Sequence, residues 1–263
     1  MARVVVFLYG LLSYVFFLGV FLYAIGFVGN ILVPKSIDTG ATDTTGGMGL
    51  ALLINAALLG LFAVQHTIMA RPGFKAWMGT IMPRAAVRST FVLSANIIFV
   101  LIFWFWRPIG GTVWEIQNTA GQMILHGLFW LGWGIVLLST FLIDHFELFG
   151  MRQSVRYLLG KDPDYPRFQV RSLYKLVRHP LMLGFLIAFW ATPTMTVGHL
   201  FFSLLTTGYI LVGLWFEERD LIAMHGAKYL EYSRQVPRLI PFTKPRRSDS
   251  RPSPQPEDEP VAP

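Results

Sequence analysis

Two polar motifs decide the fold: YKLVRHP (174–180) and WFEE (215–218), separated by an apolar run that is interrupted only around Thr-Pro-Thr (192–194). The apolar run is about 36 residues long, and at about 1.5 Å per residue it is too long for one crossing of a roughly 30 Å bilayer core and slightly short for two. We therefore predict two closely packed helices joined at 193–198. The polar ends of this hairpin would then lie on the same side of the membrane.

The whole chain is apolar enough to be an integral membrane protein. Of its 263 residues, 54% are hydrophobic and 14% are charged, and the mean hydropathy is +0.51, well above the values of soluble domains. The first apolar run, 4–28, is too long for a signal-peptide core and has no clear cleavage site, so we expect a retained span. The chain has no cysteine, which excludes disulfides, thiolate metal sites and cysteine nucleophiles. We predict no metal site.

The distribution of basic residues follows membrane topology. The net charge of +7 could suggest a nucleic-acid partner, but all of the 22 Lys and Arg residues except Lys35 and Arg107 fall in segments that share one side if the chain starts inside. The positive-inside rule then places both termini in the cytoplasm. We expect the lipid bilayer, and no nucleic acid, as the macromolecular surroundings.

Five to six hydrophobic segments predict an all-α, polytopic helical membrane protein with a C-terminal helix hairpin. The segments before the hairpin are 4–29, 48–70, 87–106 and 121–143. The segment 219–236 is amphipathic, and we expect it to lie on the membrane surface or to cap the site. We predict one membrane domain, 1–242, followed by a disordered cytoplasmic tail, 243–263, because the tail is rich in Pro, Ser and charge.

Ionisable side chains and a tyrosine converge on the inner ends of these segments, where charge is costly and function is the default explanation. They are His66, Asp144, His145, Glu147, Arg178, His179, Glu217, Glu218, Tyr229 and Arg238. Taken singly, His66 could be a hydrogen-bonded structural histidine, and 144–147 could be an interfacial salt-bridge cluster. Together they predict a site that opens to the cytoplasm between helices.

The order of motifs around the hairpin is specific. RHP (178–180) with Gly184 four residues later is followed by Glu217-Glu218, YLEY (229–232) and VPRLIP (236–241). This order resembles the isoprenylcysteine carboxyl methyltransferase superfamily. Four more segments look like the bacterial methanethiol S-methyltransferases, neighbours of the NnrU-like membrane proteins: QHTIMARP (65–72), RSTFVL (88–93), WRPI (106–109) and DHFELFG (144–150). The match covers about residues 1–242.

The resemblance implies a bacterial inner-membrane enzyme that transfers the methyl group of S-adenosylmethionine to methanethiol, giving dimethyl sulfide. Hydrogen sulfide, smaller by one methyl group, is a second candidate acceptor. Arg178 can fork onto the cofactor carboxylate, Glu217 or Glu218 can hold its ammonium, and aromatic rings can face its sulfonium. The cofactor-binding set is Tyr174, Arg178, His179, Pro180, Gly184, Glu217, Glu218, Tyr229 and Arg238.

A thiol acceptor needs a base, because the thiolate is the nucleophile. A neutral imidazole oriented by a carboxylate is the natural choice. We rank His66 first, since no structural role for it is obvious, and His145 second, with Asp144 or Glu147 as the orienting group. His179 is assigned mainly to the cofactor.

Two other functions stay open at this point. A methyltransferase acting on a prenylated or phospholipid acceptor would need a lateral opening to lipid. A non-catalytic NnrU-like transporter or accessory protein would need a polar path to the outer face, where the sequence offers only His126. The oligomeric state is not predicted.

Overall fold

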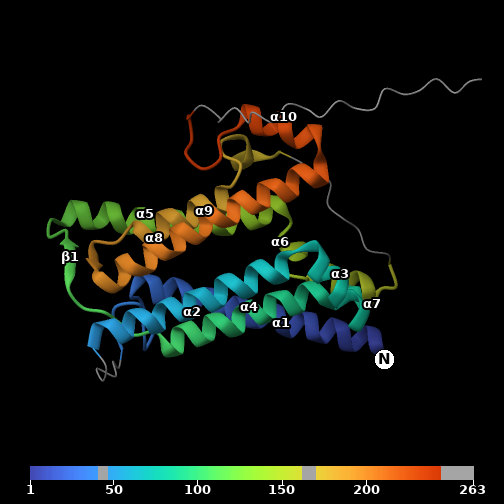
Figure 1. The fold of residues 1–263 in the computed structure, drawn as a ribbon, viewed down its shortest axis with the longest axis horizontal. Coiled ribbons are helices and arrows are strands. Elements are labelled where there is room, and N and C mark those ends of the chain that lie inside the picture. Colours follow the sequence, from blue (N-terminus) through green and yellow to red (C-terminus); the bar gives the residue numbers. More distant parts are fainter. Residues whose placement is uncertain (41–46, 162–169, 244–263) are drawn as a thin grey trace, which may run out of the picture.

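The computed structural model describes residues 1–40, 47–161 and 170–243, and nearly all of its regular structure is helical (Figure 1). The elements are α1 (Ala2–Gly29), α2 (Gly47–Ala70), α3 (Pro72–Ile81), α4 (Arg84–Phe105), β1 (Thr112–Glu115), α5 (Thr119–Ile143), α6 (His145–Leu148), α7 (Met151–Leu158), the 3-10 helix η1 (Ser172–Lys175), α8 (Pro180–Trp190), β2 (Thr194–Thr196), α9 (Val197–His225) and α10 (Ala227–Gln235). The predicted all-α membrane architecture is confirmed. Apart from Thr243, the predicted tail lies outside the described residues.

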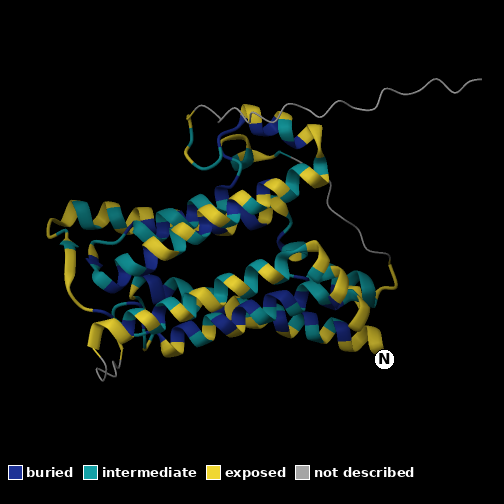
Figure 2. Cartoon of the chain, viewed as in Figure 1, coloured by how far each residue is buried: buried dark blue, intermediate teal, exposed yellow. Residues whose placement is uncertain are grey.

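Five of these helices are long and apolar enough to cross a membrane: α1, α2, α4, α5 and α9. The bounds of α1, α2, α4 and α5 agree with the predicted segments to within a few residues, because a bilayer of fixed thickness selects helices of similar length. Large apolar side chains stay exposed along them, including Leu12, Leu22, Leu53 and Ile124, and exposed positions run along the helices in Figure 2. Such surfaces suit lipid, so the chain is a multi-pass membrane protein.

The predicted C-terminal hairpin is present, with arms of unequal length. α8 has 11 residues and α9 has 29, so α8 extends about 16 Å, roughly half of a bilayer core. α9 continues past Glu218 to His225 before the chain turns at Gly226, whose φ of 55° and ψ of −130° favour glycine. The segment expected to be one amphipathic element, 219–236, is therefore the end of α9 plus α10.

The helices form two layers (Figure 1): α1, α2 and α4 pack in one, and α5, α8 and α9 in the other. α5 and α8 approach most closely at two facing glycines. A Cβ on Gly184 would lie 2.7 Å from the Gly132 carbonyl oxygen, and a Cβ on Gly132 would lie 2.7 Å from the Gly184 carbonyl oxygen. Only residues without a side chain let these two helices come so near.

At the end of the bundle where β1 and β2 pair, aromatic packing joins the two layers. Trp106 is fully buried, contacts Phe27 and Phe202 edge-on, and donates its Nε1–H to the Ile37 carbonyl at 3.0 Å. β1 and β2 pair antiparallel, with Trp114 opposite Met195. This strand pair was not predicted from the sequence, because its partners are about 80 residues apart and each strand is very short.

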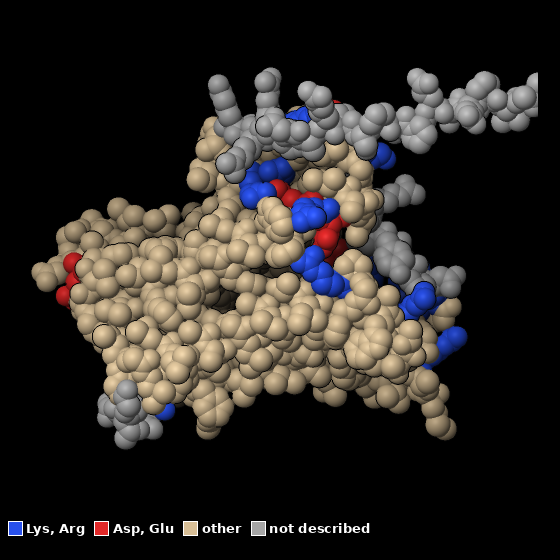
Figure 3. Space-filling view, in the orientation of Figure 1, with Lys and Arg blue, Asp and Glu red and all other residues tan. Residues whose placement is uncertain are grey.

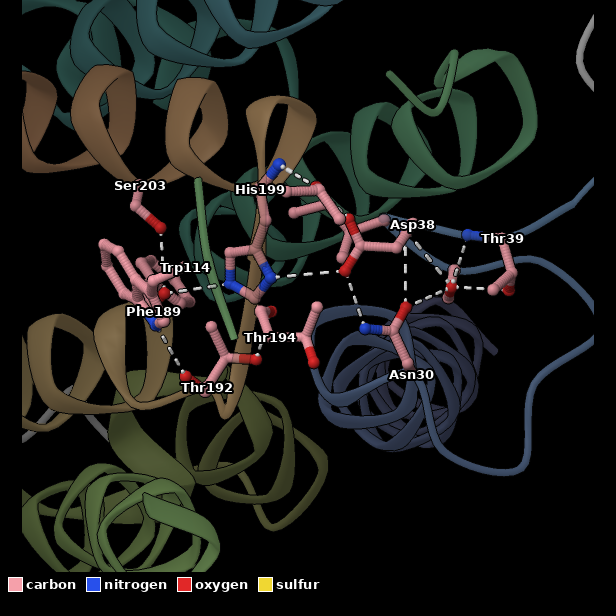
Figure 4. A network of polar contacts seen from close by, with 12 residues as sticks. Asn30, Asp38, Thr39, Trp114, Phe189, Thr192, Thr194, His199 and Ser203 are labelled. Carbon is pink, nitrogen blue, oxygen red and sulfur yellow. Dashed lines mark hydrogen bonds and ion pairs between the residues drawn. The ribbon is translucent and has the colours of Figure 1, made fainter. Parts of the chain in front are cut away.

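Beside the strand pair, a polar network closes the end of α8 (Figure 4). Nε2–H of His199 and the hydroxyl of Ser203 both donate to the Phe189 carbonyl, at 2.9 and 2.8 Å. Nδ1 of His199 lies 3.4 Å from Asp38, which also accepts from Asn30 at 2.8 Å. A helix end buried at membrane depth needs such partners for its free carbonyls, so the network allows α8 to stop halfway.

Candidate active site

A cavity of about 1180 Å³ separates the two layers. Most of its wall is apolar, and it becomes polar where α2, α5, α8 and α9 have their charged ends. Figure 3 shows a hollow in the apolar flank, with Lys, Arg, Asp and Glu gathered at one end of the molecule beside it. The wall includes most of the residues singled out from the sequence: His66, Asp144, His145, Tyr174, Arg178, His179, Glu217 and Tyr229.

Glu218 is the centre of the polar end but is turned away from the cavity wall. Its Oε1 lies 3.0 Å from Nη2 of Arg178 and 3.2 Å from Nε2 of His179. Its Oε2 accepts from Nε of Arg238 at 2.9 Å and also from Nη2 of that residue. A buried carboxylate is tolerated when its oxygens are this fully paired. Glu218 is therefore placed to hold two arginines and a histidine in position.

Glu217 points into the cavity. Its side chain is 49% exposed, against 10% for Glu218, because neighbouring residues on a helix project about 100° apart. Its Oε2 lies 3.6 Å from Nδ1 of His179. Of the two candidate carboxylates, Glu217 is the one that a ligand in the cavity can reach.

The RHP motif is fixed by backbone pairing with the chain after α10. The N–H groups of Arg178 and His179 donate to the carbonyls of Pro237 and Arg238, at 2.9 and 3.2 Å. Nη1 of Arg178 donates to the Ser233 carbonyl at 3.3 Å, while its buried Nε has no hydrogen-bond partner among the described residues. Pro180 begins α8 immediately afterwards, a position where proline is favoured.

α10 covers this site through tyrosines. Tyr232 donates its hydroxyl to the Tyr174 carbonyl at 2.6 Å, and Tyr229, Tyr232 and Val236 form a small apolar cluster. Burial raises the pKa of Tyr232 to about 12 and also raises the pKa of Tyr229 and of Tyr174. All three phenols are neutral at ordinary pH. Tyr232 stands in the YLEY motif, but its hydrogen bond to the η1 backbone joins segments 58 residues apart, so one sequence does not predict it.

His66 reaches the cavity from α2 between two aromatic rings. Its ring centroid lies 5.1 Å from Phe62 and 4.8 Å from Phe91. Its buried Nδ1 has no hydrogen-bond partner among the residues that the structure describes. An unsatisfied buried nitrogen is uncommon and calls for an explanation, such as a ligand or a catalytic role.

His145, by contrast, has both ring nitrogens engaged. The Thr140 hydroxyl donates to Leu137 and lies 2.8 Å from Nδ1, so Nδ1 must donate to it. Nε2 then accepts from the Tyr14 hydroxyl at 2.8 Å. No nitrogen of His145 is left to accept a thiol proton. The sequence could not show this, because Tyr14 comes from a distant helix.

Asp144 does not orient His145. Its carboxylate accepts the N–H of Glu147 at 3.0 Å as the N-cap of α6, and it pairs with Arg152. Glu147 itself accepts from the Gln153 side chain at 3.1 Å. These contacts fit the structural explanation of the 144–147 cluster better than a base-orienting role.

Four residues of the predicted cofactor set are not part of the cavity wall: Pro180, Gly184, Glu218 and Arg238. Gly184 serves the contact with α5 described above, and Arg238 contacts the site through its side chain on Glu218 and its carbonyl on the His179 N–H.

Sequence comparison relates the chain to named proteins. It is 52% identical over 257 residues to methanethiol S-methyltransferase 2 of Bradyrhizobium diazoefficiens, covering 97% of each chain. It is 49% identical over 242 residues to methanethiol S-methyltransferase of Mycobacterium tuberculosis, covering 92% of this chain and 98% of that one. Nurim of Sus scrofa is 28% identical over 203 residues, covering 73% and 70%. No family model and no solved structure matches.

Proposed function

The chain belongs to the methanethiol S-methyltransferase family, and from that premise we propose that it methylates methanethiol to dimethyl sulfide with S-adenosylmethionine as the methyl donor. The observation that carries the proposal is a single cavity with a charged end and an apolar body. The charged end suits the amino acid part of the donor, and the apolar body suits a small thiol.

The residues present fit the proposed donor. Arg178 lies in the cavity wall at its charged end, and its guanidinium can serve a carboxylate. Glu217 offers a carboxylate at the wall for an ammonium group. Tyr229 and Tyr174, both on the wall, add neutral aromatic faces for a cation. The bound cofactor would supply an electrophilic methyl group on a sulfonium.

Within this proposal, His66 is the base. Its ring lines the cavity and no hydrogen bond to a described residue occupies its ring nitrogens, so the imidazole can take the proton of a thiol held there. The apolar wall around it excludes water, which would otherwise solvate the thiolate and slow its attack. Holding the thiol in line with the methyl group of the donor would accelerate the transfer further, because the reacting atoms are already close and correctly oriented.

We place the charged end in the cytoplasm of a bacterial inner membrane, with both termini on that side. The gathering of basic side chains at this end in Figure 3 supports the proposal, since Lys and Arg are enriched on the cytoplasmic side. The donor would then enter from water.

The size of the cavity favours one alternative acceptor class. Methanethiol has two heavy atoms, far fewer than a cavity of about 1180 Å³ can hold even beside a cofactor. A longer lipid-soluble acceptor is therefore the second candidate, and the hollow in the flank in Figure 3 would admit it.

The deciding experiment is headspace gas chromatography over membranes that contain the protein. Membranes are supplied with methanethiol, with or without S-adenosylmethionine, and the matched control is Glu217→Gln. We expect cofactor-dependent dimethyl sulfide from the wild type and much less from the variant at low cofactor concentration. Absence of product, alongside measurable cofactor binding, would refute methanethiol as the acceptor.

A further inference from the structure

We infer that Arg88, to which the sequence assigned no role, holds the sulfur of the acceptor as a thiolate beside His66. The inference rests on the proposed function and adds a further catalytic residue to it.

Arg88 presents a positive charge at the cavity wall. It lies in the second turn of α4, a membrane-spanning helix, where a charge is expensive to keep. Nε donates to the Leu148 carbonyl at 2.7 Å, which fixes the guanidinium from one side. Among the described residues, no hydrogen bond or ion pair reaches its two Nη nitrogens.

No carboxylate in the described part of the chain neutralises Arg88 by direct contact. Glu147 is the acidic group that acts on it through space, but that carboxylate accepts a hydrogen bond from Gln153 instead. A cation at the wall of a largely apolar cavity with free donors is a site for an anion. The anion that the proposed reaction must form is the thiolate.

Arg88 and His66 contact the same aromatic ring. The Arg88 guanidinium carbon lies 5.3 Å from the Phe91 ring centroid, and the His66 ring centroid lies 4.8 Å from it. Both residues line the same cavity. A thiol held there meets a proton acceptor and a fixed positive charge together.

In the proposed step, His66 takes the proton and Arg88 stabilises the negative charge that forms on the sulfur. The S–H bond of the thiol breaks, and its proton goes to the His66 imidazole, while Arg88 stabilises the negative sulfur. A sulfur lone pair then forms the new S–CH₃ bond, and the methyl–sulfonium bond breaks with its electrons left on the donor sulfur as a neutral thioether. Preorganised charge of this kind commonly changes rates by about 100-fold or more.

The test compares Arg88→Gln with Arg88→Lys in the purified full-length protein. Gln removes the charge but keeps a donor for the Leu148 carbonyl, and Lys keeps the charge. Arg84→Ala is the matched control, since Arg84 is exposed one turn earlier on the same helix. Dimethyl sulfide formation is measured from neutral to alkaline pH, and S-adenosylmethionine binding is measured by calorimetry.

We expect Arg88→Gln to lose about 100-fold in rate at neutral pH, with the loss shrinking as alkali supplies thiolate from solution. Cofactor affinity should stay within about twofold of the wild type. Arg88→Lys should recover part of the rate, and Arg84→Ala should match the wild type. With hydrogen sulfide, a stronger acid, the loss should be smaller.

Three results would overturn the inference while leaving methyl transfer intact. They are a wild-type rate in Arg88→Gln, a loss that is equal at every pH, and a loss of cofactor binding, which would assign Arg88 to the donor carboxylate. A wild-type protein that makes no dimethyl sulfide would instead refute the proposed function itself.

Discussion

Exchanging Glu217 and Glu218, one at a time, for glutamine should separate the residue that stabilises the fold from the residue that binds the proposed cofactor. Glu218→Gln removes the carboxylate that faces Arg178 and His179, whose side chains are 8% and 6% exposed. Removing one partner of a buried ion pair costs about 3–5 kcal/mol. Because the glutamine side-chain oxygen can still accept a hydrogen bond from one of these donors, we expect a loss of folding free energy at the lower end of this range, about 3 kcal/mol. In a chain of this size, that lowers the unfolding temperature by about 6–12 °C.

Glu217→Gln should have the opposite profile. Its side chain is half exposed, and the ion-pair contact given for it is the 3.6 Å approach to Nδ1 of His179, so the free energy of unfolding should change by less than about 0.5 kcal/mol. The lost charge–charge contact to the donor ammonium should weaken S-adenosylmethionine binding by about 1.5–3 kcal/mol. That is roughly a 10- to 150-fold rise in Kd.

The assays are thermal unfolding followed by tryptophan fluorescence in detergent and cofactor titration by calorimetry. Asp220→Asn is the matched control on the same helix, since Asp220 forms a partly exposed pair with Arg71 at 3.2 Å, and such pairs contribute about 0–1 kcal/mol. Suppose that Glu218→Gln keeps the wild-type unfolding temperature and loses the cofactor, while Glu217→Gln binds normally. The division of roles argued from burial would then be wrong.

Three further changes have directions set by the structure. His66→Gln should lower the methylation rate by about 100-fold or more with unchanged S-adenosylmethionine affinity by calorimetry, and wild-type turnover would remove His66 as the base. Gly132→Ala should lower the unfolding temperature, at a cost of about 1–3 kcal/mol, while Gly134→Ala, with nothing within 4 Å of its added Cβ, should not; equal effects would contradict the close helix contact. Burial alone would raise the pKa of Asp38, but the contact with His199 and the hydrogen bonds from Thr196 and Asn30 hold that pKa below 3.8, so the stabilisation that the carboxylate contributes is complete above that pH and is lost in acid. The difference in unfolding temperature between the wild type and Asp38→Asn should therefore shrink as pH falls, and a constant difference would exclude the linkage.

The spans could be predicted because hydropathy and bilayer thickness act on each segment separately. The convergence of polar residues followed from topology, since alternate helix ends share a side. The choice between Glu217 and Glu218 could not be predicted, because it depends on the rotation of α9 about its axis. A mostly apolar helix does not fix that rotation by its own pattern.

Other differences arise from contacts between distant segments. The partners of His145 come from Tyr14 and Thr140, and the strand pair joins 112–115 to 194–196. Gly184 belongs to the same motif as the predicted cofactor residues. Its role in packing α8 against α5 could not be predicted, because the facing residue, Gly132, is distant in the sequence. A motif in one sequence does not distinguish ligands from the residues that position them.

The short helix α8 connects the polar network at one end of the molecule with the RHP motif at the other. Because α8 stops at Trp190, the Phe189 carbonyl would lack a partner at membrane depth without the donors of His199 and Ser203. Its first residues carry the RHP motif, which is held against Glu218 of the full-length α9. The hairpin thus sets a charged end beside the apolar body of the cavity. On this geometry we expect the charged donor to arrive from water and the apolar thiol from lipid, so that the two reactants meet where His66 and Arg88 share the wall with Phe91.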